Sequence, residues 1–160
     1  MGEIIANIDE LKGIVERKKA EGKRIVFGNG CFDLLHVGHI RYLKAAKGLG
    51  DCLIVAINGD KSVSELGKRK AALTPANERA EIISSITYVD YVIIFDDIDV
   101  KNLLFTLRPD IHAKGTDYTE ETVPERDVVL SYGGKIAIVG DEKDHSTREM
   151  IRQIRSMEAV

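Results

Sequence analysis

The chain is poor in cysteine, in excess charge of either sign and in long apolar runs. Its two cysteines, Cys31 and Cys52, predict neither a disulfide framework nor a metal site, and they suit a reducing compartment. The net charge is −3, without a long basic stripe, which argues against nucleic acid as a partner. No segment approaches the roughly 18 apolar residues of a membrane helix, and residues 1–5 lack the basic start of a signal peptide. We therefore expect a cytoplasmic protein with no membrane partner.

What the chain does have is a regular alternation of strand-like and helix-like segments. Its 160 residues, 44% of them apolar, suffice for one folded domain with one core. Five short runs rich in Val and Ile are typical of strands buried on both faces. They are Arg24–Phe27, Cys52–Ile57, Tyr91–Phe95, Asp110–Ala113 and Lys135–Val139. Helical patterns lie near residues 39–48, 76–87, 100–107, 125–132 and 146–157. The alternation predicts an α/β fold with a five-stranded parallel sheet.

The first residues predict a helix ahead of this alternation. Asn7 is a candidate N-cap and Glu10 follows three positions later, the arrangement of a capping box. We therefore expect residues 1–23 to form an N-terminal helical extension and residues 24–160 to form a single domain.

The run 28–39 joins a predicted strand to a predicted helix through a glycine-bearing turn. Free backbone N–H groups and the positive end of the helix dipole meet at such a junction and favour an anion. His36 and His39 flank Gly38 there, so two imidazoles can donate to phosphate oxygens while the glycine permits close approach. Surface histidines are common near helix starts, but this context favours a functional interpretation. Nucleotidyl transfer needs charge stabilisation at the α-phosphate, which such a site provides.

The same run carries a family resemblance. Its pattern Asn-Gly-Cys-Phe-Asp-x-Leu-His-x-Gly-His resembles the HxGH signature of the cytidylyltransferase-like nucleotidyltransferase superfamily. It most resembles the branch of D-glycero-β-D-manno-heptose 1-phosphate adenylyltransferases, which act in ADP-heptose synthesis. The similarity extends over roughly residues 24–155. It continues through 48–51, 62–64, 75–79, 89–92, 108–110, 114–118, 133–134 and 146–147.

The resemblance implies an activity and its partners. A Rossmann-like three-layer α/β/α nucleotidyltransferase domain would transfer AMP from ATP to a sugar 1-phosphate and release pyrophosphate. The product would be an ADP-sugar for lipopolysaccharide or a related glycan precursor. The resemblance further implies Mg²⁺ or another divalent cation, and a homodimer. Some homologues carry a fused sugar kinase. Because 23 residues precede the first predicted strand here, we expect a separate kinase to supply the 1-phosphate.

The resemblance also implies roles for individual residues. The catalytic residues would be His36, His39 and Lys68. The nucleotide-binding residues would be Asn29, Gly30, Cys31, Phe32, Gly38, Lys114, Gly115, Asp117, Ser146 and Thr147. The substrate-binding residues would be Asp33, Asp60, Lys70 and Arg79. No protein side chain is assigned to the metal.

Simpler interpretations stand beside several of these roles. The cluster Lys68–Lys70 is either a mobile loop that closes over the triphosphate or a solvated charge run. Asp33 is either a turn residue or a residue that helps to position the cation. Asp60 also favours turns, and Ser146 is a good N-cap without any ligand. Further alternatives are a surface role for Arg79 and a packing role for Cys31, which has no nearby base. His145 is assigned no role.

One loop departs from the family pattern. Similar proteins carry Leu-Lys-Gly followed by Arg-Pro, where this chain has Leu66-Gly67-Lys68 and then Ala71-Ala72. Thr116 also replaces the second of two glycines. The loop leaves the phosphate contacts and the identity of the sugar open.

Two other functions compete with the adenylyltransferase. The first is a cytidylyltransferase that uses CTP and a polyol phosphate such as glycerol 3-phosphate. Such proteins carry an arginine where this chain has Asp141 and a lysine where it has Asp96-Asp97, and both differences argue against that branch. The second is a non-catalytic nucleotide-binding module, against which the intact His36 and His39 argue.

Overall fold

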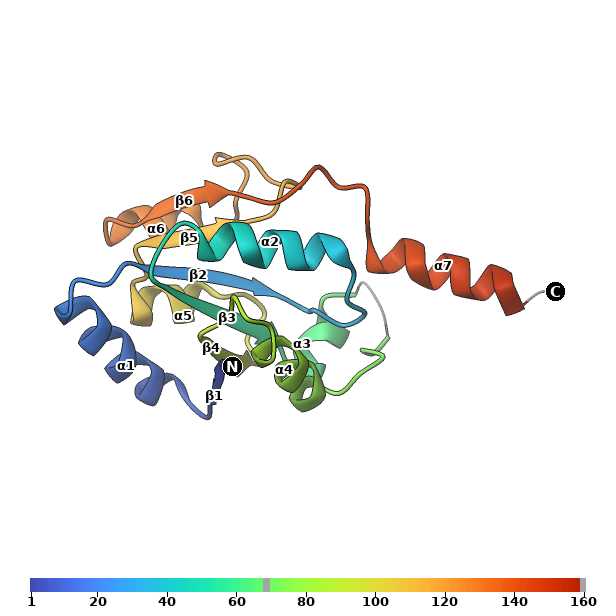
Figure 1. Cartoon of the computed structure of the whole chain (residues 1–160), viewed down its shortest axis with the longest axis horizontal. Coiled ribbons are helices and arrows are strands. Elements are labelled where there is room, and N and C mark those ends of the chain that lie inside the picture. Colours follow the sequence, from blue (N-terminus) through green and yellow to red (C-terminus); the bar gives the residue numbers. More distant parts are fainter. Residues whose placement is uncertain (68–69, 159–160) are drawn as a thin grey trace.

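The protein forms one parallel β-sheet covered by helices on both faces (Figure 1). The structure is a computed structural model that describes residues 1–67 and 70–158. The sheet has six strands in the order β1-β4-β3-β2-β5-β6, and all neighbouring strands run parallel. The strands are β1 (Glu3–Ile5), β2 (Ile25–Gly30), β3 (Cys52–Asn58), β4 (Tyr91–Phe95), β5 (Ile111–Lys114) and β6 (Lys135–Ile138). The predicted α/β class is confirmed, whereas the predicted number of five strands is wrong.

The additional strand comes from the first residues of the chain. β1 pairs with β4 through Glu3, Ile4 and Ile5, opposite Tyr91, Val92 and Ile93. With three residues, β1 is too short to show a strand pattern by itself, and only pairing with an edge of the sheet defines it. The helix that follows begins as predicted, because the Asn7 side chain accepts a hydrogen bond from the Glu10 N–H at 3.0 Å.

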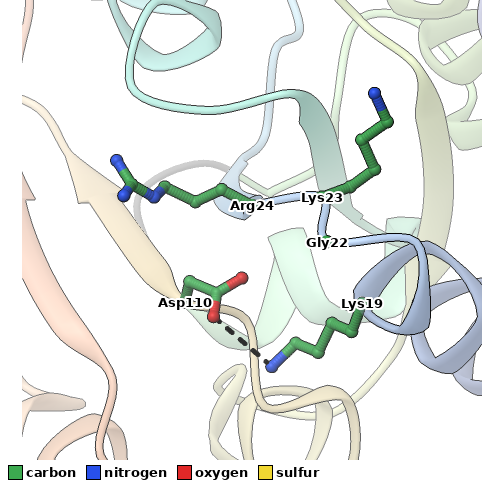
Figure 2. Close-up of a pocket in the computed structure, with 5 residues that line it drawn as sticks. All are labelled: Lys19, Gly22, Lys23, Arg24 and Asp110. Atoms are coloured by element: carbon green, nitrogen blue, oxygen red, sulfur yellow. Dashed lines mark ion pairs between the residues drawn. The ribbon is translucent and has the colours of Figure 1, made fainter.

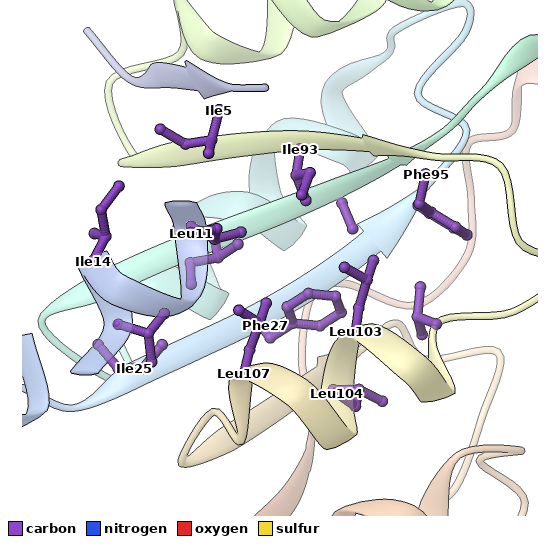
Figure 3. Packing of buried hydrophobic residues seen from close by; sticks show 14 of the residues in the cluster. Ile5, Leu11, Ile14, Ile25, Phe27, Ile93, Phe95, Leu103, Leu104 and Leu107 are labelled. Carbon is purple, nitrogen blue, oxygen red and sulfur yellow. The ribbon is translucent and has the colours of Figure 1, made fainter. Parts of the chain in front are cut away.

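The helices divide between the two faces of the sheet according to their apolar sides. They are α1 (Ile8–Ala20), α2 (Val37–Lys47), α3 (Asp60–Glu65), α4 (Ala76–Ser84), α5 (Lys101–Leu107), α6 (Arg126–Ser131) and α7 (Thr147–Glu158). Buried residues of α1, α5 and α6 pack with Phe27 in one core cluster, most of which Figure 3 shows. Buried residues of α2 and α4 pack with Val26 in the second cluster. Every residue of β3 is buried, as expected for a strand covered on both faces.

The strand order places a topological switch beside β2. From β2 the chain passes through α2 to β3 on one side, whereas β5 pairs with β2 on the other side. In open α/β sheets, ligands bind outside the carboxyl ends of strands at such a point. The segments that follow β2 and β5, residues 31–36 and 115–118, therefore lie where a ligand site is expected.

The last helix differs from the others. α7 buries none of its residues and extends away from the rest of the chain in Figure 1. Its first residue, Thr147, is nevertheless tied to the turn after β2, because its Oγ1 donates to the Leu34 carbonyl at 2.7 Å. None of the helices within residues 1–67 and 70–158 combines the length and apolarity needed to cross a membrane.

Candidate active site

Two histidines form the start of α2. His36 is the N-cap residue, and its Nδ1 accepts a hydrogen bond from the Gly38 N–H at 3.1 Å. The His36 N–H in turn donates to His39 Nδ1 at 3.2 Å. The two bonds form a reciprocal capping box in which imidazoles replace the usual Ser and Glu. The ring centroids lie 3.9 Å apart, so the turn holds both rings as one unit.

This geometry fixes the tautomer of both rings. Each Nδ1 accepts a backbone N–H, so a neutral ring must carry its proton on Nε2. Burial and the neighbouring His36 lower the pKa of His39 to about 4. Burial, His145 and Lys143 lower the pKa of His36. Both rings are therefore neutral near pH 7, and each presents one Nε2–H donor.

The backbone of the turn is shaped to bring these rings together. A Cβ on Gly38 would lie 2.9 Å from His36 Nδ1, so only glycine allows the His36 ring to fold over the helix start. Phe32 adopts a left-handed conformation with φ of 48°, which is uncommon for a bulky residue and is held in place by its surroundings. Its buried ring lies 5.5 Å from the ring of His39. The strained residue thus supports a catalytic candidate.

The segment 141–147 brings further polar groups to the histidines, and two of them had no predicted role. The His145 ring lies 6.2 Å from the His36 ring, and the positive charge of Lys143 is close enough to lower the pKa of His36. Sequence reasoning missed both residues, although their position just before Ser146-Thr147 was an available signal. The structure therefore adds His145 and Lys143 to the candidate site.

The same segment is fastened to the end of β5. The Asp117 carboxylate lies 2.7 Å from Lys143 Nζ, and the Thr116 hydroxyl donates to the Asp141 carbonyl at 2.7 Å. Ser146 caps α7, since its Oγ accepts from the Glu149 N–H at 3.0 Å. The predicted residues Asp117, Ser146 and Thr147 are thus joined through one connected loop system.

Arg79 holds the other side of the site from within the protein. Its side chain is fully buried. Its guanidinium donates to the carbonyls of Cys31, Asn58 and Thr74 at 2.7, 2.7 and 2.9 Å, and to Asp60 Oδ1 at 2.8 Å. These four bonds use four of the five guanidinium N–H groups. Arg79 therefore joins the ends of β2 and β3 to the segment before α4, and a direct contact with substrate stays a prediction.

The two predicted substrate-binding aspartates are also engaged within the protein. The buried Asp33 carboxylate accepts the backbone N–H groups of Leu73 and Thr74 at 2.8 and 3.0 Å. Asp60 accepts from Ala76 and Arg79, and although burial opposes it, these two bonds hold the pKa of Asp60 below its usual value. Both carboxylates tie residues 73–76 to the site, and contacts with a sugar stay predictions.

The remaining predicted residues differ in what the structure says of them. The Asn29 side-chain oxygen is buried and has no hydrogen-bond partner among the described residues, which is unusual for a buried polar atom. A Cβ at Gly115 would meet no protein atom within 4 Å, so packing does not demand glycine there. Cys31 contributes its carbonyl to Arg79. Lys70 is exposed, whereas Lys68 lies outside the described residues.

No metal cage accompanies these residues in the part of the chain that the structure describes. Residues 1–67 and 70–158 contain no group of three or more His, Cys, Asp or Glu side chains placed to hold a metal ion. An open cavity of about 280 Å³ lies elsewhere, at the amino edge of the sheet. Figure 2 shows its lining residues, with an ion pair of 3.7 Å between Lys19 and Asp110. It is formed by Lys19, Gly22, Lys23, Arg24 and Asp110.

Known proteins resemble most of this chain in sequence. "Bifunctional protein HldE" of Geobacter sulfurreducens is 45% identical over 150 residues, which cover 94% of this chain and 31% of that protein. The protein of the same name from Geobacter metallireducens is 48% identical over the same length, with the same coverage. The chain thus spans about a third of the length of these curated relatives.

Two solved structures share the fold. One is described as the lipopolysaccharide core biosynthesis protein from Thermoplasma volcanium, with a TM-score of 0.65 and 32% identity over 74% of this chain and 97% of that one. Pantothenate synthetase from Thermus thermophilus has a TM-score of 0.63 at 14% identity, over 86% of this chain and 61% of that one, which shows the fold alone. The family model described as Cytidylyltransferase-like matches residues 27–157, so the chain belongs to the cytidylyltransferase-like nucleotidyltransferase family.

Proposed function

We propose that this chain is an adenylyltransferase that transfers AMP from ATP to a sugar 1-phosphate, with D-glycero-β-D-manno-heptose 1-phosphate as the substrate. The observation that carries the proposal is the pair of neutral imidazoles at the start of α2. Their Nδ1 atoms accept backbone N–H groups, which leaves the Nε2–H groups of His36 and His39 to donate to phosphate oxygens.

The reaction needs little covalent help from the protein. The phosphate of the sugar is already anionic near neutral pH, and its oxygen attacks the α-phosphorus of ATP in line as pyrophosphate leaves. His36 and His39 donate hydrogen bonds to the α-phosphate oxygens as negative charge develops there, aided by the N-terminal dipole of α2. Because both rings are neutral beforehand, they act as fixed donors and not as proton sources.

The nucleotide lies between the ends of β2 and β5 in this proposal. The unpartnered Asn29 oxygen supports a contact with a ligand donor, and the open space at Gly115 supports close approach of the nucleoside. Asp117 accepts from ribose hydroxyls. Ser146 and Thr147, at the N-terminus of α7, bind the distal phosphates. Gly30, Cys31, Phe32 and Lys114 complete the predicted nucleotide contacts, and Lys68 or Lys70 screens the leaving group.

A divalent cation enters with the nucleotide. The described residues offer no acidic cluster for a dedicated cage, and Mg²⁺ keeps several waters and binds substrate phosphates readily. Mg²⁺ held by the triphosphate would neutralise charge on the leaving pyrophosphate. No protein side chain is assigned as its ligand.

The sugar and the pathway rest on similarity. The resemblance of the turn 28–39 to heptose 1-phosphate adenylyltransferases favours a heptose. The relative described as a lipopolysaccharide core biosynthesis protein supports synthesis of a glycan precursor. The curated relatives named bifunctional extend well beyond the region matched here. That a separate kinase supplies the sugar 1-phosphate stays a prediction. A homodimer also stays a prediction, which light scattering of the purified chain tests.

A two-way panel tests the proposal. ATP and CTP are each combined with heptose 1-phosphate, heptose 7-phosphate and glycerol 3-phosphate, and pyrophosphate release is measured. We expect turnover only with ATP and the heptose 1-phosphate. Turnover with CTP and glycerol 3-phosphate would replace the proposal with the cytidylyltransferase. Activity on the 7-phosphate without added kinase would overturn the expectation of a separate kinase.

A further inference from the structure

A buried charged cluster lies beside the end of β5, and the mechanism above uses only one of its three members, Lys114. His112 and Lys114 are alternate residues of this strand, so their side chains project from the same face of the sheet. Glu125 precedes α6, which packs on that face. Glu125 Oε2 is 3.6 Å from His112 Nε2 and 3.7 Å from Lys114 Nζ, and the three side chains are at most 10% exposed. Their charges therefore interact with little screening by water.

The His112 ring does not donate a hydrogen bond to the Glu125 carboxylate. Its Nδ1 lies 3.3 Å from the Phe27 carbonyl oxygen, which can only accept, so Nδ1 carries the proton. Burial lowers the pKa of His112, and a neutral ring leaves a lone pair on Nε2. His112 Nε2 and Glu125 Oε2 both lack a hydrogen-bond partner among the described residues. Two acceptors therefore face each other across 3.6 Å.

The Lys114 ammonium is then the cation that balances Glu125. Although burial raises the pKa of Glu125, the neighbouring charge of Lys114 helps to bring it below its usual value, so the group is a carboxylate at neutral pH. A buried carboxylate whose neighbours are this distant is costly, and fold stability alone does not account for it. Such groups call for a functional reason.

Lys114 lies at the edge of the sheet where the nucleotide is proposed to bind, which supplies a functional reason for the cluster. β2 and β5 pair through Phe27 and His112, and Lys114 lies two residues further toward the carboxyl edge, directly before Gly115. Its Nζ is 4.6 Å from the centroid of the Tyr118 ring. The ammonium is thus held between an aromatic face and the Glu125 carboxylate at the edge where the nucleotide is proposed to bind.

We propose that Glu125 and His112 are positioning residues that hold the Lys114 ammonium in the orientation in which it meets the nucleotide. The carboxylate attracts the ammonium. The His112 ring, packed 5.6 Å from the Phe27 ring, lies 3.6 Å from the same carboxylate oxygen, and with its proton on Nδ1 it donates no hydrogen bond that would compete with Lys114 for that oxygen. The inference rests on the proposed function for the identity of the ligand as a nucleotide. The position of Lys114 beside Glu125 does not depend on that function.

The test begins with a readout that is independent of turnover. In Glu125→Gln, the new amide can donate to His112 Nε2, so we expect the fold to persist while the counter-charge of Lys114 is lost. Acetylation of Lys114 by acetic anhydride, followed by mass spectrometry, should rise at least about threefold over wild type because the ammonium is released. Asp127→Asn removes an exposed carboxylate of α6 and should leave the rate unchanged. An unchanged rate in Glu125→Gln would overturn the inference.

The second readout separates binding from chemistry. In Glu125→Gln, KM for ATP should rise about fivefold or more while kcat stays within about twofold, and Glu125→Asp should recover most of the loss. A rise in acetylation without a change in KM would show that the lysine does not meet the nucleotide, and would overturn the inference. If wild type turns over CTP instead, the ATP assignment fails, and the same ratio measured with CTP still decides this inference. If it turns over neither, calorimetric Kd values for both nucleotides replace KM.

Discussion

The free backbone groups at the two edges of the sheet are hydrogen-bonded by side chains of opposite charge. At the amino edge, carboxylates accept the N–H groups with which strands begin. Ile25 donates to Asp110 Oδ2 and Leu53 donates to Asp90 Oδ2, each at 2.7 Å. At the carboxyl edge, the buried Arg79 guanidinium donates to carbonyls where strands end. Because all strands run parallel, one edge needs acceptors and the other needs donors.

The two edges differ in the polar side-chain atoms that still lack a hydrogen bond once the strand ends are capped. The other carboxylate oxygen of Asp110 forms an ion pair with Lys19, whose ammonium also donates to the Arg108 carbonyl. At the carboxyl edge, the Asn29 oxygen stays without a partner, and within the described residues the Nε2 atoms of His36 and His39 take part in no hydrogen bond. Charged residues at an edge of the sheet therefore do not by themselves indicate a ligand site. Polar groups that remain without a hydrogen bond after the strands are capped do indicate one.

The largest expected effect comes from removing the Nε2–H donors while keeping the helix cap. Asn offers a side-chain oxygen close to the place of Nδ1, and it is a favourable N-cap residue. The variants His36→Asn and His39→Asn should each lower kcat about 100-fold or more, as expected for the loss of one donor to a developing anion. Stopped assays of pyrophosphate release measure the loss, and circular dichroism should show unchanged folding. Retained activity in the double variant would refute the role of the pair.

Breaking the donor that caps the carboxyl edge should cost stability first. Arg79→Met removes the hydrogen bonds that the guanidinium donates to the carbonyls of Cys31 and Asn58 and to the Asp60 carboxylate, and we expect the free energy of unfolding to fall by about 3 kcal/mol. Urea denaturation measures this change. As a matched control, Arg152→Met removes an exposed arginine of α7 paired with Glu149 and should leave the unfolding curve unchanged. Equal curves for both variants would contradict the assigned role of Arg79.

The amino edge should respond in stability alone. Asp110→Ala removes the acceptor for the Ile25 N–H and should lower the free energy of unfolding by about 1–2 kcal/mol, while Asp110→Asn, which keeps an oxygen, should cost less. Neither variant should alter KM or kcat, because this edge lies opposite the site. A change in KM for either substrate would mean that the cavity of Figure 2 communicates with the active site.

The last prediction concerns the dependence of stability on pH. The pKa of His39 is lowered to about 4 in the folded chain, against about 6.5 when unfolded. Between these values the unfolded chain binds more protons, so the stability held above pH 6.5 falls as the pH drops toward 4. We expect His39→Asn to make the free energy of unfolding less dependent on pH in that window. Urea titrations from pH 4 to 8 measure this, and identical slopes for the two proteins would disagree with a neutral His39.

Much of the fold could be predicted because it depends on local patterns. The five longer strands, the Asn7 cap and the helices at 39–48 and 146–157 follow from periodicity and turn chemistry. β1 and the six-residue α3 could not, because short elements acquire their definition from pairing and packing with distant residues. The turn 28–39 was predicted as a phosphate site from residues close together in sequence, which is why its geometry needed no long-range information.

The rest of the site depends on contacts between distant segments. His145 and Lys143 lie more than a hundred positions after His36, yet the return of the chain past β6 brings them beside it. Arg79 looked like a side chain that reaches toward a substrate, and its burial among carbonyls became visible only once α4 was packed on the sheet.

The parallel α/β class and the place of the two histidines at a helix start are encoded locally, since both follow from spacing along the chain. The approach of His145 and Lys143 to His36, the burial of Arg79 and the cluster of His112, Lys114 and Glu125 depend instead on the packing of distant segments. The physical reason is that a lone pair, a desolvation cost or an ion pair depends on which atoms face each other across the sheet edge, and the order of the strands sets that.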